Sequence, residues 1–551
     1  MIIIFGTVCA FGIDAQEPLF RAGIMTDTHI EKTEESCRYV KKAFEFFREK
    51  KTDMIIHLGD LADRHYPEGY RIYRRYFDEI FRDQRPQEII LYTDHDQLDC
   101  SDYETFVREF QEELKIPHKP YDKRIVNGYP FLIFPQSVEK EFSKMEEIIE
   151  QAIRDYPDKP IFVLHHCPMF NTVSGSRAGL CLEGRLVLDK YPQVVHLSGH
   201  THGSLRNENN IHQDTYTTVN AGCLQLWQGN LVGKNLSSKR NDEVMIMEVY
   251  SQKLLFRRYT LSDNSEIGAE NPWAIPLPFD PKTAPYNPER RKASAPVPAF
   301  PKNSAITLRK DGSPFRSISF SFPDAHSSGG CYFYRVELER ERNGRYESFA
   351  CKEDYSDFYL KKKREYMEID FNSGFFEPGE KYRVKITPVN FFGGGGIPLR
   401  MTFTAGNPQK GKVVFFTDNP SRDCIYTAKK GTSIPGVDGW YLFSDRDSLG
   451  ELRFPENIYS SVSDGSILRI TVELEQIQPE FPRKRFWIGK GDFKRASSDS
   501  IFLREGKTSR ERIVFDVRKK ANEHYTLLVS HGVEPGPIRF HSVKIEDLGK
   551  L

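Results

Sequence analysis

Five short clusters of Asp and His residues constrain the fold of this chain more than any other feature. Each cluster lies at or just after the end of a short apolar segment in the first half of the sequence. The clusters are Asp27-Thr28-His29, Gly59-Asp60-Leu61-Ala62-Asp63, Thr93-Asp94-His95-Asp96, His165-His166-Cys167-Pro168 and Gly199-His200-Thr201-His202. In α/β sheets, ligands bind beyond the carboxyl ends of the strands. The five clusters therefore predict one converging site at the edge of a sheet.

The apolar segments alternate with amphipathic helices over residues 20–262. Val40 and Phe47 lie on one face of a predicted helix, whereas residues 54–58 form an apolar run interrupted only by His57. Continuous runs of this kind are typical of strands that are covered on both faces. Residues 17–270 are therefore predicted to form an α/β layered sandwich. His57 and His196, inside such runs, are interpreted as buried strand histidines with no role in the site.

The chemistry of the clusters favours two divalent metal ions. Carboxylates together with imidazoles suit manganese, iron or zinc, and the absence of thiolates among the ligands argues against a structural zinc site. A bridging carboxylate is needed to hold two cations close together. Asp60 is the candidate, because the preceding Gly59 lets the backbone turn tightly into the site.

The order of the clusters resembles that of the calcineurin-like phosphoesterases. That family has Asp-x-His, Gly-Asp-x-x-Asp, Gly-Asn-His-Asp/Glu, His and Gly-His-x-His, and the match spans about residues 20–260. The resemblance implies a first metal held by Asp27, His29, Asp60 and His202. It implies a second metal held by the bridging Asp60 together with Asp94, His166 and His200.

The resemblance also implies a catalytic role for the third cluster. His95 would contact the phosphate and protonate the leaving oxygen, Asp96 would orient His95, and Asp63 would support the ligands. His165 competes with His166 as a ligand, and His166 is preferred because His166-Cys167-Pro168 fits the family's His-x-Pro. The implied reaction is hydrolysis of a phosphate mono- or diester by a hydroxide that bridges the metals.

The third cluster departs from the family pattern, because Thr93-Asp94 stands where the family has Gly-Asn. Asp can ligate as Asn does, so a second metal is still expected, with one more negative charge beside it. The departure keeps an alternative open, in which the chain is an exported glycan-binding or adhesion protein with a decayed phosphoesterase domain. A nuclease is disfavoured, since the first half shows no basic stripe.

The segment after the fourth cluster, residues 169–185, is rich in small and polar residues. It could cover a substrate, with Arg177 or Arg185 reaching a phosphate, or it could be an ordinary solvated loop. The two interpretations stay open at this point.

Residues 271–304 are rich in proline and are interpreted as a linker, in which the prolines prevent both helix formation and strand pairing. Residues 305–405 are predicted to form a β-sandwich, because Tyr382, Val384 and Ile386 alternate with polar residues. The stretch 376–384 resembles the turn and tyrosine of fibronectin type III domains.

Residues 406–551 are also rich in strands and resemble a jelly-roll sandwich of the galactose-binding kind. Carbohydrate is the partner expected there, because Trp440, Tyr441 and Trp487 could stack on sugar rings. Core packing is the preferred interpretation for each of these aromatic residues.

The first residues are apolar and uncharged up to Asp14, which favours a secretory signal over residues 1–16, with a buried first strand as the alternative. The protein is therefore expected to be exported to the periplasm, the cell surface or the medium. No later segment approaches the length of a membrane span. The 78 basic and 78 acidic residues balance, so nucleic acid is not expected as a partner.

The nine cysteines are scattered and show no zinc-finger spacing. Cys331 and Cys351 flank a predicted hairpin that turns at Asn343-Gly344. A two-residue turn would place Cys351 opposite Val336, so no cross-strand disulfide is expected between the two cysteines.

Overall fold

The structure is a computed structural model of the chain. It describes residues 17–30, 34–100, 102–116, 121–134, 136, 142–176, 181–224, 242–310, 318–371, 376, 379–405, 411–428, 433–435, 440–443, 449–476, 485–492, 501–502, 509–530 and 538–550. The predicted signal over residues 1–16 and the candidate Arg177 lie outside these ranges. No helix among the described residues is long and apolar enough to cross a membrane.

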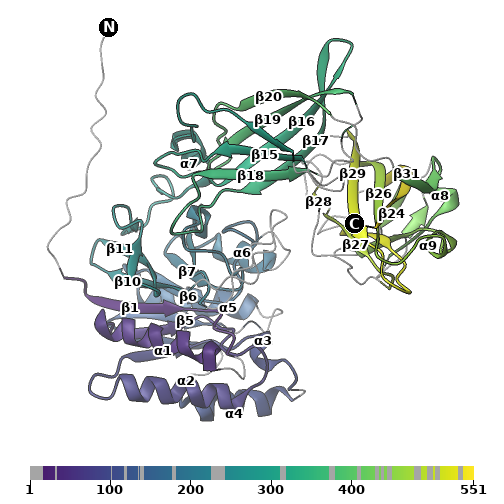
Figure 1. The fold of residues 1–551 in the computed structure, drawn as a ribbon. Coiled ribbons are helices and arrows are strands. Elements are labelled where there is room, and N and C mark those ends of the chain that lie inside the picture. The colour runs from purple at the N-terminus through teal and green to yellow at the C-terminus, as the bar shows by residue number, and fades with distance from the viewer. Residues whose placement is uncertain are drawn as a thin grey trace, which may run out of the picture.

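Two sheets form the centre of the first half of the chain (Figure 1). The first has the order β12-β11-β10-β1-β2-β3, with β13 also paired to β11. Its strands are β1 (Phe20–Met25), β2 (Met54–His57), β3 (Gln87–Ile90), β10 (Glu243–Val249), β11 (Lys253–Thr260), β12 (Ser265–Ile267) and β13 (Trp273–Pro276). β1, β2 and β3 are parallel, as their long crossovers through helices require.

The second sheet has the order β4-β5-β6-β7-β9-β8, with β5, β6, β7 and β9 parallel. Its strands are β4 (Asp122–Val126), β5 (Tyr129–Ile133), β6 (Ile161–Leu164), β7 (Val194–Ser198), β8 (Ile211–Gln213) and β9 (Thr217–Asn220). The helices of this half are α1 (Glu34–Glu49), α2 (Pro67–Ile80), α3 (Asp94–Gln97), α4 (Tyr103–Leu114), α5 (Phe142–Asp155), α6 (Leu182–Leu188) and the 3-10 helix η1 (Glu208–Asn210).

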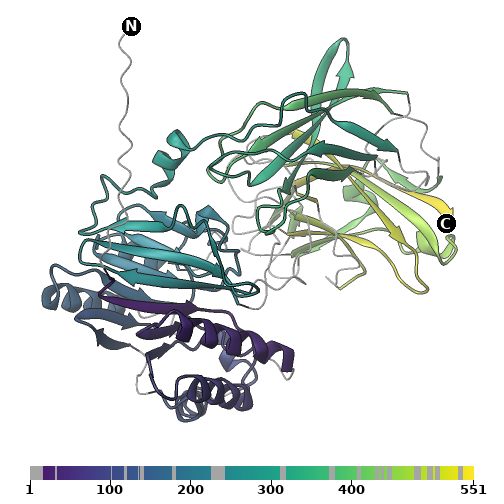
Figure 2. The ribbon, with the colours of Figure 1, turned by 60° about the vertical axis from the view of Figure 1, so that its left-hand side comes forward.

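The two sheets pack face to face and helices cover their outer faces, which gives four layers (Figures 1 and 2). Between the sheets, the Phe20 ring of β1 meets the Phe131 ring of β5 with centroids 6.3 Å apart. Outside, Phe44 of α1 and Phe77 of α2 belong to one core cluster with the first sheet, while Ile149 of α5 belongs to another with the second sheet. Each such side chain contributes about 1.5–3 kcal/mol by leaving water. The predicted α/β layered sandwich is confirmed.

The proline-rich segment does more than link domains, and the expectation that its prolines prevent helix and strand pairing is wrong. β13 pairs with β11 and ends at Pro276, on an edge where the missing N–H matters little. Helix α7 (Pro288–Ser294) begins at a proline, whose fixed φ suits the first helical turn, and the Asn287 side chain caps it. Trp273 of β13 is 1% exposed and is part of the core between the two sheets.

The next part of the chain is a β-sandwich made of a three-stranded and a four-stranded sheet. Its strands are β14 (Thr307–Lys310), β15 (Ile318–Pro323), β16 (Phe333–Arg342), β17 (Arg345–Tyr355), β18 (Tyr366–Phe371), β19 (Lys381–Val389) and β20 (Leu399–Thr404). The predicted alternation in β19 is confirmed, with Tyr382, Val384 and Ile386 buried.

The hairpin of β16 and β17 turns at Asn343-Gly344, but a bulge at Leu338/Glu339 shifts its register by one residue. Cys351 therefore lies opposite Glu337 instead of Val336. Cys331 and Cys351 form no disulfide bond, and neither do the other six cysteines among the described residues.

The last part of the chain forms a second sandwich, with sheets β23-β24-β31-β26-β29 and β22-β25-β30-β27-β28, the first of which is also joined by β21. The elements are β21 (Lys412–Thr417), α8 (Pro420–Asp423), β22 (Ile425–Ala428), β23 (Ser433–Pro435), β24 (Trp440–Phe443), β25 (Leu449–Arg453), α9 (Asn457–Ser460), β26 (Ser466–Gln476), β27 (Arg485–Gly489), β28 (Ile501–Phe502), β29 (Ser509–Arg518), β30 (Thr526–Ser530) and β31 (Ile538–Lys550). Trp487 is 3% exposed, which confirms core packing for it. The side chains of Trp440 and Tyr441 lie outside the described part.

Candidate metal centre

The five clusters follow strands that end at a common edge of the two packed sheets. Asp27 comes two residues after β1, Asp60 three residues after β2, and Asp94 four residues after β3. In the second sheet, His166 and His200 each come two residues after a strand, β6 and β7. Parallel pairing within each sheet brings the carboxyl ends together, so the topology assembles the site that the sequence predicts.

Most of the converging residues have a left-handed backbone. The residues with positive φ include Asp27 (53°), His29 (40°), Asp60 (52°), His200 (69°) and His202 (50°). A non-glycine residue in this region costs of order 1–3 kcal/mol and persists where the surrounding structure holds it. The concentration of such residues at one edge of the sheets shows that the surrounding structure enforces the backbone geometry there.

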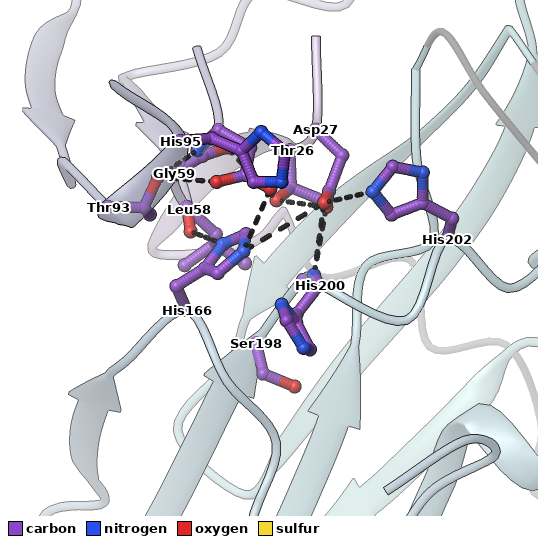
Figure 3. Close-up of polar contacts among 12 residues, drawn as sticks. Thr26, Asp27, Leu58, Gly59, Thr93, His95, His166, Ser198, His200 and His202 are labelled. Atoms are coloured by element: carbon purple, nitrogen blue, oxygen red, sulfur yellow. Dashed lines mark hydrogen bonds and ion pairs between the residues drawn. The ribbon is translucent and has the colours of Figure 1, made fainter. Parts of the chain in front are cut away.

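One group of donor atoms consists of Asp27, His29, Asp60 and His202, all buried and all within 4.8 Å of one another. His202 Nε2 lies 2.9 Å from Asp27 Oδ1 (Figure 3). His29 Nε2 lies 3.5 Å from Asp60 Oδ2. The Nε2 atoms of His29 and His202 are only 3.2 Å apart. Two imidazole nitrogens and two carboxylates aimed at one point fit a divalent cation.

A second group shares Asp60 with the first and adds His166 and His200. His166 Nε2 lies 3.2 Å from Asp60 Oδ2, while its Nδ1 faces the carbonyl of Leu58 at 2.8 Å. A hydrogen bond from Nδ1 to that carbonyl fixes the ring so that Nε2 is the nitrogen that faces Asp60. His165 instead directs its Nδ1 to the carbonyl of Cys167 at 2.9 Å, so the geometry supports His166 over His165.

Hydrogen bonds hold the buried carboxylates of Asp27 and Asp60, and those to Asp27 are drawn in Figure 3. Asp27 Oδ2 accepts from the Thr26 hydroxyl at 2.7 Å and from the backbone N–H of His200 at 3.0 Å. The Thr93 hydroxyl donates to Asp60 Oδ1 in a short hydrogen bond and accepts from the Asp60 N–H at 3.2 Å. Thr93, which replaces the glycine of the family pattern, therefore braces the proposed bridging residue.

Charge attraction dominates the ionisation of these groups. Burial by itself would raise the pKa of Asp27, but the imidazoles of His202 and His166 outweigh it and lower the pKa to about 2. Burial would lower the pKa of His166, but Asp60 raises it to about 10. The attraction that favours a proton on His166 would equally favour a divalent cation beside it.

His95 and Asp96 occupy different environments from those expected. His95 Nδ1 lies 3.4 Å from the carbonyl of Asp63 and 3.5 Å from its carboxylate, and its ring meets that of His29 at 5.0 Å. Asp96 is fully buried and accepts from the N–H groups of Ala62 at 2.8 Å and Thr93 at 3.2 Å. The expectation that Asp96 orients His95 is therefore wrong, because Asp63 contacts His95 and Asp96 stabilises the loop after Asp60.

Asp94 is the one predicted ligand outside the donor groups found among the described residues. It is the first residue of α3, its side chain is exposed, and its Oδ1 accepts from the His95 N–H at 3.0 Å. The other predicted ligands converge. Arg185 does not face the site as a free cation, since it binds the carbonyls of Phe170 and Asn171 at 3.0 and 2.8 Å.

His57 and His196 are fully buried, as predicted for strand histidines. His57 lies 3.1 Å from the Thr28 hydroxyl, and His196 lies 2.8 Å from that of Thr218. The bracing roles of Thr93 and Asp96 are not among the roles predicted from the sequence. Their spacing, Thr-x-x-Asp before a helix, is that of a capping box and could have indicated them.

Residues 20–204 match the family model of calcineurin-like phosphoesterases, so this part of the chain is a calcineurin-like phosphoesterase domain. No curated protein matches the chain at a significant level.

Several solved structures are similar to parts of the chain. One is a dimetal phosphatase from Danio rerio, with 10% identity and a TM-score of 0.31 over 46% of this chain and 99% of that one. Another is a purple acid phosphatase from yellow lupin, Lupinus luteus, with 13% identity and a TM-score of 0.34 over 46% of this chain and 53% of that one. A carbohydrate-binding module of a Cellvibrio mixtus lichenase has 13% identity and a TM-score of 0.17 over 24% of this chain and 98% of that one.

Proposed function

We propose that the calcineurin-like phosphoesterase domain of this protein hydrolyses a phosphate mono- or diester with the help of two divalent metal ions. One observation carries the proposal: two groups of donor atoms, which are buried except at the half-buried His200, share the carboxylate of Asp60. A carboxylate common to two donor groups is the arrangement that two neighbouring cations require. Manganese, iron and zinc all suit a set of carboxylates and imidazoles.

In this proposal Asp27, His29, Asp60 and His202 hold the first ion, and Asp60, His166 and His200 hold the second. When bound, the ions would supply a nucleophile at neutral pH and neutralise charge that develops on the phosphate. The protein itself keeps the donor atoms in place through Thr26, Thr93 and the carbonyl of Leu58. Asp94 joins the second group in the proposal, as its place just after β3 allows.

His95 is proposed to contact the phosphate and to protonate the leaving oxygen. Its side chain is 38% exposed, so the ring can reach a ligand that enters from solvent. Asp63 faces Nδ1, which leaves Nε2 free to contact the substrate. A proton held at Nε2 could pass to a leaving group without any change in the metal ligands.

The test compares hydrolysis by the natural protein with that by Asp60→Ala, on a panel of mono- and diesters with each metal supplied in turn. Asp83→Ala, at an exposed aspartate on the surface of the same domain, is the matched control. Turnover should fall by orders of magnitude in Asp60→Ala and stay unchanged in Asp83→Ala. Hydrolysis that survives the loss of Asp60 would overturn the proposal.

We also propose that the protein is exported, because its amino-terminal run is apolar. We propose further that residues 406–551 bind carbohydrate, because aromatic side chains in this part could stack on sugar rings. Trp487 does not contribute to carbohydrate binding in this proposal, because its ring is buried. Amino-terminal sequencing of the protein from cells and binding of the full chain to insoluble polysaccharides test the two points. An uncleaved terminus and an absence of polysaccharide binding would refute them.

A further inference from the structure

The loop that carries His200 and His202 needs support from outside itself. Both residues have left-handed φ values, 69° and 50°. Without support, each could relax to an ordinary conformation and turn its imidazole away from the carboxylates. The contacts that hold this loop therefore decide how well the donor atoms stay together.

The neighbouring segment, residues 207–210, supplies part of that support. The Asn207 N–H and the Asn210 Nδ2 both donate to the carbonyl of Ser204, each at 2.9 Å. On the other side, Gly175 packs so closely against Thr201 that a Cβ at Gly175 would lie 3.1 Å from the Thr201 Cβ. Thr201 stands between the two histidines, so the loop is held from both directions.

Asn209 connects these supports to the first β-sandwich. Its Nδ2 donates to the carbonyl of Phe391, beyond the end of β19, at 2.8 Å. Its own carbonyl accepts from the N–H of Ser174 at 3.0 Å, in the segment that leads to Gly175. One residue thus contacts the sandwich, the segment before Gly175 and, through its chain neighbours, the carbonyl of Ser204.

A cation next to Asn209 reinforces the same junction. Arg291 of α7 donates to the carbonyls of Glu208 at 2.8 Å and Ile211 at 3.1 Å, which lie on either side of Asn209 and Asn210. Its guanidinium also lies 4.1 Å from the centre of the Phe392 ring. The sandwich therefore contacts the 207–211 segment directly through the carbonyl of Phe391 and indirectly through Arg291, which lies over the Phe392 ring.

The part of the sandwich that makes these contacts is itself rigidly held. The side-chain oxygen of Asn390 accepts from the N–H groups of Phe392 at 3.0 Å and Gly394 at 2.8 Å. Its Nδ2 donates to the carbonyl of Pro296 at 3.2 Å, and the residue is 1% exposed. The carbonyl of Phe391 is thus presented to Asn209 from a fixed turn.

We infer that Asn209 is a positioning residue, through which the first β-sandwich holds the His200–His202 loop in the geometry that binds metal. The inference deepens the proposed function, because it rests on His200 and His202 being metal ligands. It also assigns the sandwich a part in the metal site, although the sandwich supplies no ligand.

The test measures Co²⁺ affinity by titration of the metal-free full-length protein, with the cobalt absorption bands as the readout of ligand geometry. Asn209→Leu keeps the shape of the side chain but removes the donor, and it should weaken Co²⁺ binding by about threefold to tenfold, as expected for one lost hydrogen bond. Turnover at saturating metal should change much less than the affinity. A merely structural role would lower stability and leave both the affinity and the absorption bands unchanged.

Two further variants make the test specific. Asn209→Asp also loses the donor but adds a negative charge, so electrostatics alone would tighten Co²⁺ binding, whereas a lost contact weakens it. Asn390→Ala, in the sandwich, should weaken binding in the same direction. Combined with Asn209→Leu it should add little, because both changes release the same contact. Ile397→Ser, at an 85% exposed site of the same sandwich, is the control.

The outcomes separate this inference from the proposed function. If the natural protein binds no Co²⁺, the proposed function fails. If it binds Co²⁺, and Asn209→Leu and Asn390→Ala bind it with the same affinity and the same absorption bands, only the positioning role of Asn209 is overturned. If Asn209→Leu does not fold, Asn390→Ala alone decides the question in the same way.

Discussion

Replacing Trp273 by alanine should destabilise the phosphoesterase domain strongly, although the residue lies in the segment that the sequence marks as a linker. The ring is 1% exposed, and its Nε1 donates to Glu208 Oε2 at 2.9 Å. The guanidinium of Arg258 lies 4.2 Å from the ring centre. Trp273 therefore contributes apolar burial, a hydrogen bond and a cation–π contact at one position.

The magnitude follows from what the substitution removes and what it leaves. Trp→Ala substitutions in cores cost about 3–5 kcal/mol, which includes the cavity that remains. The Glu208 carboxylate would keep its ion pairs with Arg258 at 2.7 Å and with Arg291 at 3.3 Å, so it would not be left without a partner. We therefore expect a loss of about 4 kcal/mol and no large additional penalty from a buried charge.

Native-state hydrogen exchange of β11 in the full-length protein is the suitable assay, because three packed units need not unfold in one step. Pro276→Ala, on the same strand but exposed, is the control. The opening free energy of β11 should fall in Trp273→Ala and stay constant in the control. A change below about 1 kcal/mol would show that residues 273–276 are not part of the core and would restore the linker interpretation.

Three further predictions concern the site and the core. In Gly199→Ala the new Cβ would lie 2.1 Å from the Thr26 hydroxyl and 2.5 Å from Asp27 Oδ2, so Asp27 would be displaced and the variant should bind less metal. Elemental analysis measures the metal content, and a full content would contradict the close packing. His95→Ala should lower turnover without loss of metal, and less for esters with a very acidic leaving group; equal losses across a leaving-group series would remove the proton-donor role. Burial, and to a lesser extent the charge of His165, lowers the pKa of His196 from an ordinary 6.5 to about 3, so the unfolded state binds the proton more tightly than the folded state. The contribution of His196 to stability is therefore full above pH 6.5, and the free energy of unfolding should fall by up to about 4 kcal/mol as the pH drops towards 3. Unfolding of His196→Gln measured across this range should show a smaller acid loss, and an identical loss would exclude His196 as its source.

The converging site was predictable because its signals are local. Each cluster adjoins an apolar run, and a parallel sheet places the ends of such runs at one edge whatever the details of packing. A short motif also led to the choice of His166 over His165, which stays a prediction. In the structure His166 Nε2 faces Asp60, while His165 faces the carbonyl of Cys167.

The contacts between side chains of neighbouring clusters were not predictable in the same way. Asp96 lies next to His95 in the chain, yet its carboxylate points to backbone N–H groups after β2, whereas Asp63 from another cluster faces His95. Adjacency in sequence does not determine side-chain direction at the start of a helix. Asp94 shows the same effect, since its position as the first residue of α3 leaves its side chain exposed.

Tertiary packing also overrode local propensity in the proline-rich segment. Its prolines indicate a linker. However, the free energy that Trp273 contributes by burial between the sheets exceeds the cost of the hydrogen bond that Pro276 cannot donate at the end of β13. A similar limit applies to the hairpin of β16 and β17. The turn at Asn343-Gly344 could be predicted from the sequence. The bulge at Leu338/Glu339 depends on packing in the sandwich, and it changes the residue opposite Cys351.

The central claim is that Asp60 bridges two metal ions, and anomalous diffraction from crystals of the protein loaded with Mn²⁺ tests it most directly. If Asp60 bridges the ions, two manganese peaks should lie on either side of its carboxylate. One peak should lie among Asp27, His29 and His202, and the other should lie beside His166 and His200. A single peak, or two peaks that do not share Asp60, would show that Asp60 does not bridge two metal ions.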